Sequence, residues 1–176
     1  MAILSGYKRV CRRNVGGVSL IGFVPAQNIE DIPSSEGLGT DILFREGSKK
    51  FEEYQSSLDN AEFKVSSQEQ SIQLRFNALE AKSSIAYNEL LDAAACGLVA
   101  LVQMNNGAVA IVGWSEEFKG RRPLMNIEAD GTSGKAITDE NYLDVTLKTT
   151  QVTAPLYLDE EAALKIDTYF EPIKAE

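Results

Sequence analysis

The sequence predicts a mainly β fold, an antiparallel β-sandwich or barrel with one flanking α-helix (about residues 84–96) and a long loop (about residues 31–50). Three observations support this prediction: several segments alternate apolar and polar residues, an Asn-Gly pair separates two apolar runs, and one stretch has clear helical periodicity. The chain has 176 residues, 44% hydrophobic and 24% charged, as is typical of an ordinary globular domain. We therefore expect a single domain over residues 1–176.

The first expected strand covers residues 17–24 (GVSLIGFV), a short β-branched and aromatic run between Gly17 and Pro25. A basic cluster precedes this run, and the two together weakly resemble a secretory signal peptide. We favour a strand over a signal peptide, because glycines interrupt the apolar run and Pro25 ends it. The cluster consists of Lys8, Arg9, Arg12 and Arg13.

The segment from Asp31 to Lys50 predicts a long loop, since glycine, proline, serine and charged residues surround one apolar island at 42–44. A connection of about 20 residues is long for a compact domain, and such loops are usually functional or disordered. The apolar island indicates that this loop packs on something.

Residues 62–65, 72–77 and 143–148 alternate apolar and polar side chains, which favours antiparallel strands with one wet face. Residues 122–130 predict a further strand. Near the carboxyl end, either Asp159 caps a short helix through Ile166 or residues 168–173 add an edge strand.

The expected helix has one apolar face with a period of 3.6 residues. Ser83 or Ser84 can cap its start, and Gly97 supplies the usual stop. Because the face is narrow and rich in alanine, we expect the helix to lie flat against a sheet. The face consists of Tyr87, Leu90, Leu91, Ala94 and Leu98.

Residues 98–104 and 108–113 predict a β-hairpin at the centre of the core, because Asn105-Asn106-Gly107 between them is a strong signal for a type I′ turn. Trp114 closes the second strand. With Phe118 and the intervening Glu116 and Glu117 it suggests either a ligand cleft or, as we favour, a core or interface aromatic.

The chain contains no histidine, which removes the Ser-His-Asp, Cys-His and HExxH arrangements and the usual base that titrates near neutral pH. Residues 131–135 (GTSGK) lack the spacing of a phosphate-binding loop and predict a turn. We expect no catalytic residues, no metal site and no cofactor, and we expect that the protein is not an enzyme.

Two alternatives involve the oxygen-rich stretch at residues 139–144, which leads into the alternating segment at 143–148. Its oxygens suggest either a calcium site or, as we favour, a solvated loop, because the spacing of an EF-hand is missing. An enzyme with Asp139 and Asp144 as catalytic carboxylates would place them in a cleft with raised pKa values. The stretch contains Asp139, Glu140, Asn141 and Asp144.

The net charge is −9, which argues against binding to the phosphate backbone of a nucleic acid and against binding to an anionic membrane surface. No apolar stretch approaches the roughly 20 residues of a membrane span, so we expect no membrane anchor. The basic cluster is a weak nucleic-acid signal, and contact with an acidic surface of a neighbouring copy explains it equally well. We expect Cys11 and Cys96 to be reduced, half-buried side chains.

Over residues 84–152, a short helix precedes the hairpin LVALVQMNNGAVAIVGW, and a strand, a turn-rich SG…DEN loop and an alternating strand follow. This order of elements resembles the tail tube proteins of long-tailed bacteriophages. The resemblance implies a β-sandwich or barrel subunit that forms hexameric rings, which stack into a tube through which DNA passes without specific binding. It implies a protein of the virion tail, made in the bacterial host cytoplasm, whose partners are itself and other tail or connector proteins.

The same fold builds type VI secretion tubes and tail terminator or connector rings, which stay open as alternatives. In the tail tube family the long loop reaches a neighbouring ring. We therefore expect contacts between rings from Ile42, Leu43, Phe44, Arg45, Lys49 and Lys50. We expect contacts within or between rings from Lys8, Arg12 and Arg13.

A second hypothesis is a monomeric β-barrel binding module with a pocket near Trp114 and a self-packed loop at 31–50. A flat acidic face along one sheet, without a concave pocket, would favour the tube over both the binding module and the enzyme.

Overall fold

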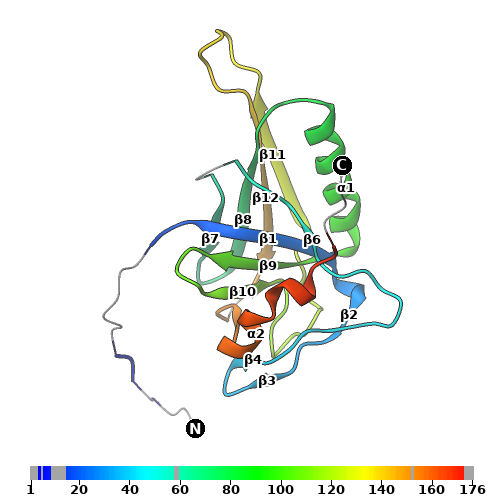
Figure 1. Ribbon diagram of the computed structural model, residues 1–176, viewed down its shortest axis with the longest axis vertical. Helices are drawn as coiled ribbons and strands as arrows, with labels where there is room; N and C mark the ends of the chain where they lie inside the picture. The colour runs from blue at the N-terminus through cyan, green and yellow to red at the C-terminus, as the bar shows by residue number, and fades with distance from the viewer. Residues whose placement is uncertain (1–3, 5, 9–14, 58–59, 152, 173–176) are drawn as a thin grey trace.

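Two β-sheets face each other, a long helix lies beside them, and a folded loop and short helices cover the outer side of the larger sheet (Figure 1). The computed structural model describes residues 4, 6–8, 15–57, 60–151 and 153–172. The expected mainly β class is confirmed.

The larger sheet has seven strands, in the order β3-β4-β13-β10-β9-β1-β6. All neighbours are antiparallel except β13 and β4, which are parallel. The strands are β1 (Val18–Pro25), β3 (Ser34–Ser35), β4 (Leu38–Gly39), β6 (Glu52–Glu53), β9 (Leu98–Met104), β10 (Val109–Val112) and β13 (Leu156–Leu158).

The second sheet has four antiparallel strands, in the order β11-β12-β8-β7. The strands are β7 (Glu62–Val65), β8 (Glu69–Phe76), β11 (Asn126–Thr132) and β12 (Tyr142–Thr150). A two-stranded sheet pairs β2 (Ile29–Asp31) with β5 (Leu43–Phe44) after the 3-10 helix η1 (Ala26–Asn28). The two large sheets stay separate, so the sandwich-like form of the expected fold is present and the closed barrel is wrong.

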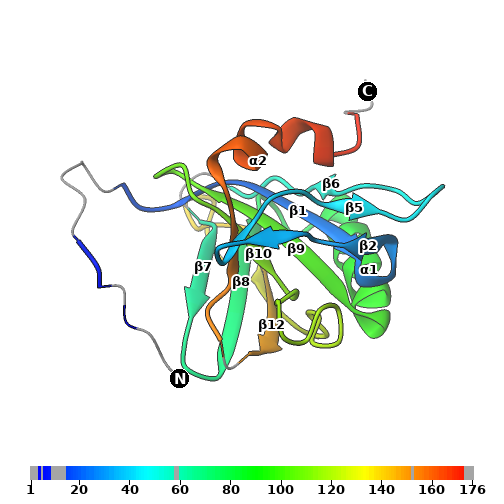
Figure 2. The same ribbon diagram turned by 90° about the horizontal axis from the view of Figure 1, so that it is seen from below.

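One core fills the space between the two large sheets, where α1 (Ala81–Cys96) also packs through Leu90 and Ala94. A second core lies on the opposite face of the seven-stranded sheet, under the loop and the carboxyl-terminal helices. Figure 2 shows α2 (Glu160–Leu164) on one side of that sheet and β7, β8 and β12 on the other. The central strands β9 and β10 are therefore buried on both faces, which agrees with the predicted place of this hairpin at the centre of the core.

The β9–β10 hairpin is confirmed, but its turn is not type I′. Gly107 has a φ of 91°, and Asn106 is not among the residues with positive φ. The loop has three residues, closed by Met104 N donating to Ala108 O (2.8 Å) and by Gly107 N donating to Met104 O (2.9 Å). In such a loop a type I turn is followed by one left-handed residue, so only the glycine needs positive φ.

Helix α1 begins three residues before the expected start at 84, at Ala81. Ser83 is not the N-cap. It lies in the first turn, and its Oγ accepts a hydrogen bond from Glu80 N at 3.1 Å, the reciprocal half of a capping box. Gly97 ends the helix with a φ of 97°, as expected.

The segment 31–50 is an ordered part of the molecule, in which Ile32 and Ile42 are buried in the second core. The carboxylate of Asp41 accepts hydrogen bonds from the Tyr169 hydroxyl and from Ile42 N, each at 2.8 Å. Burial and the Asp41 carboxylate raise the pKa of Tyr169. The expectation that the apolar island packs on something is confirmed, and it packs on its own chain.

Near the carboxyl end, the helix alternative is correct. Asp159 caps α2 by accepting a hydrogen bond from Ala162 N at 2.7 Å. The 3-10 helix η2 (Ile166–Tyr169) follows, so the edge-strand alternative for 168–173 is wrong within the described residues, where Phe170 makes only an isolated bridge to Phe51.

Candidate functional site

The four-stranded sheet has one polar face that points away from the core. Strand pairing places these side chains in cross-strand rows, because directly paired residues of an antiparallel sheet lie on the same face. We call this surface the polar face. Its charged and polar members are Glu62, Lys64, Glu69, Ser71, Gln73, Arg75, Asn126, Glu128, Asp130, Asp144, Thr146 and Lys148.

Arg75 organises one end of the polar face. Its Nε and Nη2 donate to the two carboxylate oxygens of Asp144, at 2.7 and 3.0 Å. Its Nη1 donates to Glu140 at 3.0 Å, and the guanidinium carbon lies 3.8 Å from the centre of the Tyr142 ring. The hydrogen bond with Asp144 is the main cause that raises the pKa of Arg75. A bidentate pair with a stacked ring holds its partners in one geometry.

Carboxylates outnumber cations on the polar face. Lys148 pairs with Glu128 at 3.4 Å, and Lys64 pairs with Glu62 at 3.7 Å. The carboxylates are Glu62, Glu69, Glu128, Asp130 and Asp144, and the cations are Lys64, Arg75 and Lys148. The face is acidic but not flat, because eight of its side chains line a shallow hollow of about 320 Å³.

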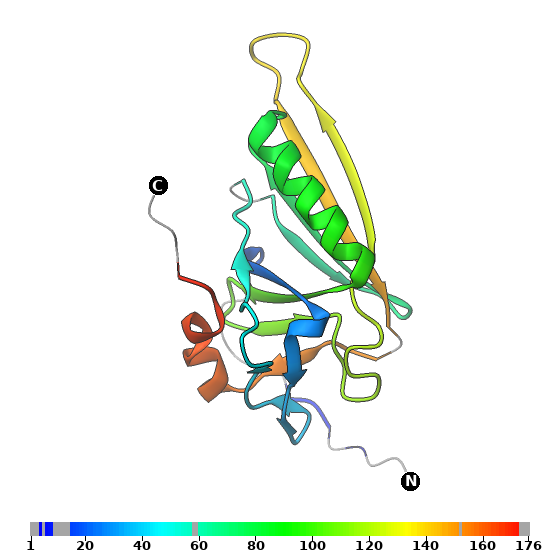
Figure 3. The ribbon, with the colours of Figure 1, turned by 90° about the vertical axis from the view of Figure 1, so that its right-hand side faces the viewer.

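Both edges of the four-stranded sheet are open within the described residues. Strand β11 pairs only with β12, and β7 pairs only with β8. Six of the seven residues of β11 are exposed, and the β11–β12 hairpin stands away from the body (Figures 1 and 3). An open edge presents unpaired N–H and C=O groups to another chain.

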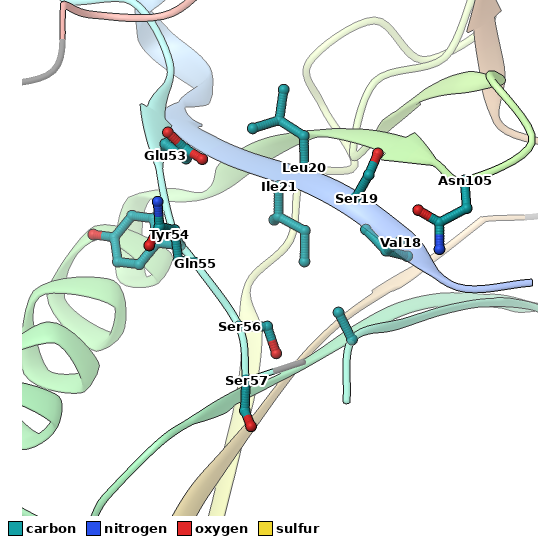
Figure 4. A pocket seen from close by; sticks show the side chains of 11 residues that line it. Val18, Ser19, Leu20, Ile21, Glu53, Tyr54, Gln55, Ser56, Ser57 and Asn105 are labelled. Atoms are coloured by element: carbon teal, nitrogen blue, oxygen red, sulfur yellow. The ribbon is translucent and has the colours of Figure 1, made fainter. Parts of the chain in front are cut away.

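A cleft of about 410 Å³ lies where β1 loses its outer neighbour. The pairing of β1 with β6 ends near Ile21, and the chain then crosses to β8, where Ser57 N donates to Arg75 O at 2.7 Å. Figure 4 shows Ile21 pointing from β1 toward the side of Ser56, whereas Leu20 points the other way. The cleft is lined by Val18, Ser19, Leu20, Ile21, Glu53, Tyr54, Gln55, Ser56, Ser57, Ala61 and Asn105.

Tyr54 lines both this cleft and a second hollow of about 340 Å³ beside the start of α1. Its ring packs edge-on against Phe23, with centroids 5.4 Å apart. Burial and the carboxylate of Glu89 raise the pKa of Tyr54, so its hydroxyl stays protonated at neutral pH.

The six loop residues expected at ring contacts divide into two groups. Ile42 is 4% exposed and Phe44 packs edge-on against Phe51, so these two belong largely to the core of their own chain. Leu43 is 42% exposed. Arg45, Lys49 and Lys50 are also exposed, although Lys50 Nζ donates to Thr168 O at 2.9 Å.

Of the basic residues expected at contacts, Lys8 is exposed, and Arg12 and Arg13 lie outside the described residues. Cys96 is a free thiol and is exposed rather than half-buried as expected, and Cys11 lies outside the described residues.

The oxygen-rich stretch is organised by the protein itself. Asp139 accepts N–H groups from Ala136 and Lys135, which lower its pKa, opposite to the raised value that the enzyme alternative requires. Asn141 accepts from Leu79 N, and Asp144 is held by Arg75. In the described part of the chain, no three or more acidic or cysteine side chains cluster as metal ligands do.

Trp114 is 6% exposed in the second core. The turn at 115–120 covers its ring so closely that a Cβ on Gly120 would lie 3.0 Å from it. The core interpretation of Trp114, which we favoured over a ligand cleft, is therefore confirmed, and its buried ring leaves no support for the pocket of the binding-module hypothesis at this residue.

The alternation at 62–65, 72–77 and 143–148 correctly predicted which side chains face solvent, but no local pattern distinguishes Glu62, Arg75 or Glu128 among them. The signal in the sequence is the set of polar positions in each alternating segment. The pairing of distant strands, which brings these positions together on one surface, has no local signature in the sequence.

The chain was compared with protein-family models, with curated proteins and with solved structures, and no match was found. None of the helices in the described ranges has the length and apolar character needed to cross a membrane.

Proposed function

We propose that the chain is a virion structural protein of the tail tube type, which assembles into hexameric rings that stack into a conduit for DNA. The observation that carries this proposal is the pair of open edges of the four-stranded sheet. Its polar face is acidic, but it is hollowed and not flat as the tube hypothesis expected. An open β11 edge on one copy and an open β7 edge on the next allow a continuous sheet to form around a ring. Pairing one edge with a different edge is a heterologous contact, which closes when the rotation fits.

The polar face would line the channel. Its excess of carboxylates repels a DNA phosphate backbone, and this repulsion acts within a Debye length of about 8–10 Å at physiological salt. The paired lysines and Arg75 are held by carboxylates of the same chain, which reduces their attraction for phosphate. Such a wall allows DNA to slide without specific binding.

The exposed loop residues remain available for ring contacts in this proposal. They are Leu43, Arg45, Lys49 and Lys50. The buried Ile42 supports the loop from inside and is not proposed as a contact. Lys8, Arg12 and Arg13 are kept as proposed contacts from the amino-terminal segment, and charge reversal at Arg12 and Arg13 that left assembly unchanged would remove them.

The first test is light scattering on a concentration series, with negative-stain images of the same samples. Rings or tubes support the proposal, and a protein that stays monomeric at high concentration refutes it. Tail terminator or connector rings and a secretion tube are distinguished by whether the rings stop at a fixed number or stack without limit.

The edge contact is tested with proline. On an edge strand, successive N–H groups point alternately to the neighbouring strand and to solvent, so one of Glu128→Pro and Ala129→Pro removes only a solvent-facing N–H. That variant should keep the thermal unfolding transition of the wild type and lose ring formation. If both variants fold and both form rings, β11 does not pair between copies.

A binding module is the second candidate, since the loop at 31–50 is folded on its own core as that hypothesis predicted, and the cleft beside β1 provides a concave surface. It would use the cleft lined by Ile21 and Tyr54 in place of the expected pocket at Trp114. A strictly monomeric protein in the scattering series favours this candidate.

A further inference from the structure

Strand β1 has an open outer edge along its first half. Its outer neighbour β6 pairs with only two residues of β1, and Tyr54 N adds one hydrogen bond to Ile21 O at 2.9 Å. Within the described part of the chain, no strand lies beside the outer edge of residues 18–20. This stretch is roughly 10 Å long at the usual rise of a strand. Open main-chain groups of this kind can receive an added strand from another chain.

The chain that follows β6 is held away from β1, so this edge stays open. Ser57 N donates to Arg75 O at 2.7 Å, and Arg75 N donates to Ser56 Oγ at 2.9 Å, which fixes the segment on β8 of the other sheet. Figure 4 shows the segment diverging from β1 after Tyr54. The cleft of about 410 Å³ lies between them. Both walls of the cleft are therefore anchored before any partner binds, which lowers the entropy lost on association.

The surroundings of the cleft are acidic. Glu53 is the one charged side chain among the residues that line it, and Glu53 makes no ion pair with any described residue. Arg75, whose backbone holds one wall, has its guanidinium paired with Asp144 and Glu140. The charged residues around Tyr54, in the cleft and in the adjoining hollow, are four carboxylates and one cation: Glu52, Glu53, Glu80, Glu89 and Lys82.

The segment before β1 has the complementary charge. Residues 1–17 contain four cations and no carboxylate side chain. In the described part of this segment, Leu4 is 96% and Tyr7 is 88% exposed, so these apolar side chains make almost no contact with their own chain. A cationic segment with an exposed aromatic anchor suits an acidic cleft beside an open strand edge. The cations are Lys8, Arg9, Arg12 and Arg13.

We propose that residues 4–8 of one copy bind as an added strand on the open edge of β1 of a second copy, with Lys8 paired with Glu53. The inference rests on the proposed assembly of the chain with copies of itself, and it names the surface that receives the amino-terminal segment. The partner is a second copy because Leu4 and Tyr7 stay exposed on their own chain, although β1 follows them closely in sequence.

The alternation of side chains fits this contact. Ile21 and Tyr54 pack on the core between the two large sheets, whereas Leu20 packs on the second core, on the opposite face. Glu53 pairs with Gly22 and so lies on the face of Leu20. Because successive residues of a strand point to opposite faces, a strand that places Tyr7 against Ile21 and Tyr54 presents Lys8 on the face of Glu53.

The contact is tested by cross-linking in an equal mixture of isotopically heavy and light full-length protein. A carbodiimide activates the Glu53 carboxylate, the Lys8 amine attacks the activated carbonyl carbon, and an amide forms as the carbodiimide leaves as a urea. Mass spectrometry of the digest should find Lys8–Glu53 products that join a heavy to a light chain as often as products of two like chains. Products of like chains alone mean that the segment binds its own cleft, and no product means that it binds elsewhere. Either result overturns the inference.

The apolar part of the contact is tested by Tyr7→Ser, with Leu164→Ser as the matched control, because Leu164 is also exposed (83%) but lies on α2. Both variants should keep the wild-type unfolding midpoint, because neither side chain is buried. Tyr7→Ser should need at least about tenfold more protein to assemble in light scattering. The control should assemble at the wild-type concentration. If Tyr7→Ser assembles there too, the inference is wrong.

The charge pair is tested by exchange. Lys8→Glu and Glu53→Lys should each raise the concentration needed for assembly, and the double variant should recover at least part of the loss, because the pair is restored with reversed signs. Glu117→Lys is the control, since Glu117 is an exposed carboxylate on the turn that covers Trp114. A double variant that assembles no better than either single variant overturns the pairing.

The inference and the proposed function fail in different ways. If the wild type forms rings but gives no cross-linked products of heavy with light chains, only the inference about the amino-terminal segment is wrong. If such products form in a protein that makes no rings at any concentration, the inference stands and the proposed function is wrong.

Discussion

Replacing Ile42 with alanine separates two roles for the loop at 31–50, a surface element that binds a neighbour and a cover that completes the core. Ile42 is 4% exposed and packs in the second core, which also contains Phe51 and Trp114. The adjacent Leu43 is 42% exposed and provides a matched control on the same loop.

The magnitude follows from burial. Truncating a buried isoleucine to alanine costs about 2–5 kcal/mol, depending on how far the site collapses. Because this loop lies at the periphery of the second core and can move inward, we expect a loss of about 2–4 kcal/mol for Ile42→Ala. Leu43→Ala removes a side chain that is already half in water, so we expect a loss below about 1 kcal/mol.

Urea unfolding of the monomer, followed by tryptophan fluorescence, measures this difference, because Trp114 is the single tryptophan and lies in the same core. With an m-value of about 2 kcal/mol/M, the unfolding midpoint of Ile42→Ala should fall by about 1–2 M. Equal midpoints for the two variants would refute the reasoning, since Ile42 would then contribute nothing to the monomer.

Three further predictions concern the backbone and the attachment of the loop. Tyr169→Phe removes the hydroxyl that donates to Asp41 and should lower the free energy of unfolding by about 1–2 kcal/mol. The folded pKa of Tyr169 is raised, so its contribution is present below the unfolded value of 10.0 and is lost as the pH rises above it; urea titrations should show the wild type losing more stability above pH 10 than Tyr169→Phe. Gly113→Ala should lower the thermal unfolding midpoint, with a loss of more than about 1 kcal/mol, because φ is 91° and the new Cβ would lie 2.8 Å from Leu98 O. Glu36→Asn should raise the free energy of unfolding by about 0.5–1 kcal/mol in calorimetry, because Glu36 has a φ of 54° and asparagine tolerates this left-handed conformation; a loss of stability would contradict the assignment of strain to this residue.

The folded state of the loop bears on the proposed assembly into rings. In that proposal, a loop that was disordered in the monomer would lose conformational entropy each time a ring was added. Here Ile32, Ile42 and the Tyr169–Asp41 hydrogen bond have already ordered it. The remaining exposed side chains, with Leu43 among them, are presented on a fixed support, so contacts made through them require little further ordering.

Elements with a strong local signal could be predicted from the sequence. The strand at 18–25, the helix that ends before Gly97, and the β9–β10 hairpin all have periodicity, turn residues or caps within a few positions of one another. The start of α1 was misplaced, because Glu80 and Ser83 form a reciprocal cap that the serine alone did not indicate. The turn type at 105–107 was also missed, since an Asn-Gly pair fits both a two-residue and a three-residue loop.

The sequence by itself determined the mainly β class, the single long helix, the central place of the β9–β10 hairpin in the core and the positions that face solvent in each alternating strand, because these depend on side-chain periodicity over a few residues. Tertiary structure alone decided where the apolar island at 42–44 packs, that Trp114 is covered, and that Arg75 meets Asp144. These features arise from contacts between residues far apart in the chain, and the free energy of such contacts depends on the pairing of whole sheets, which no short segment encodes.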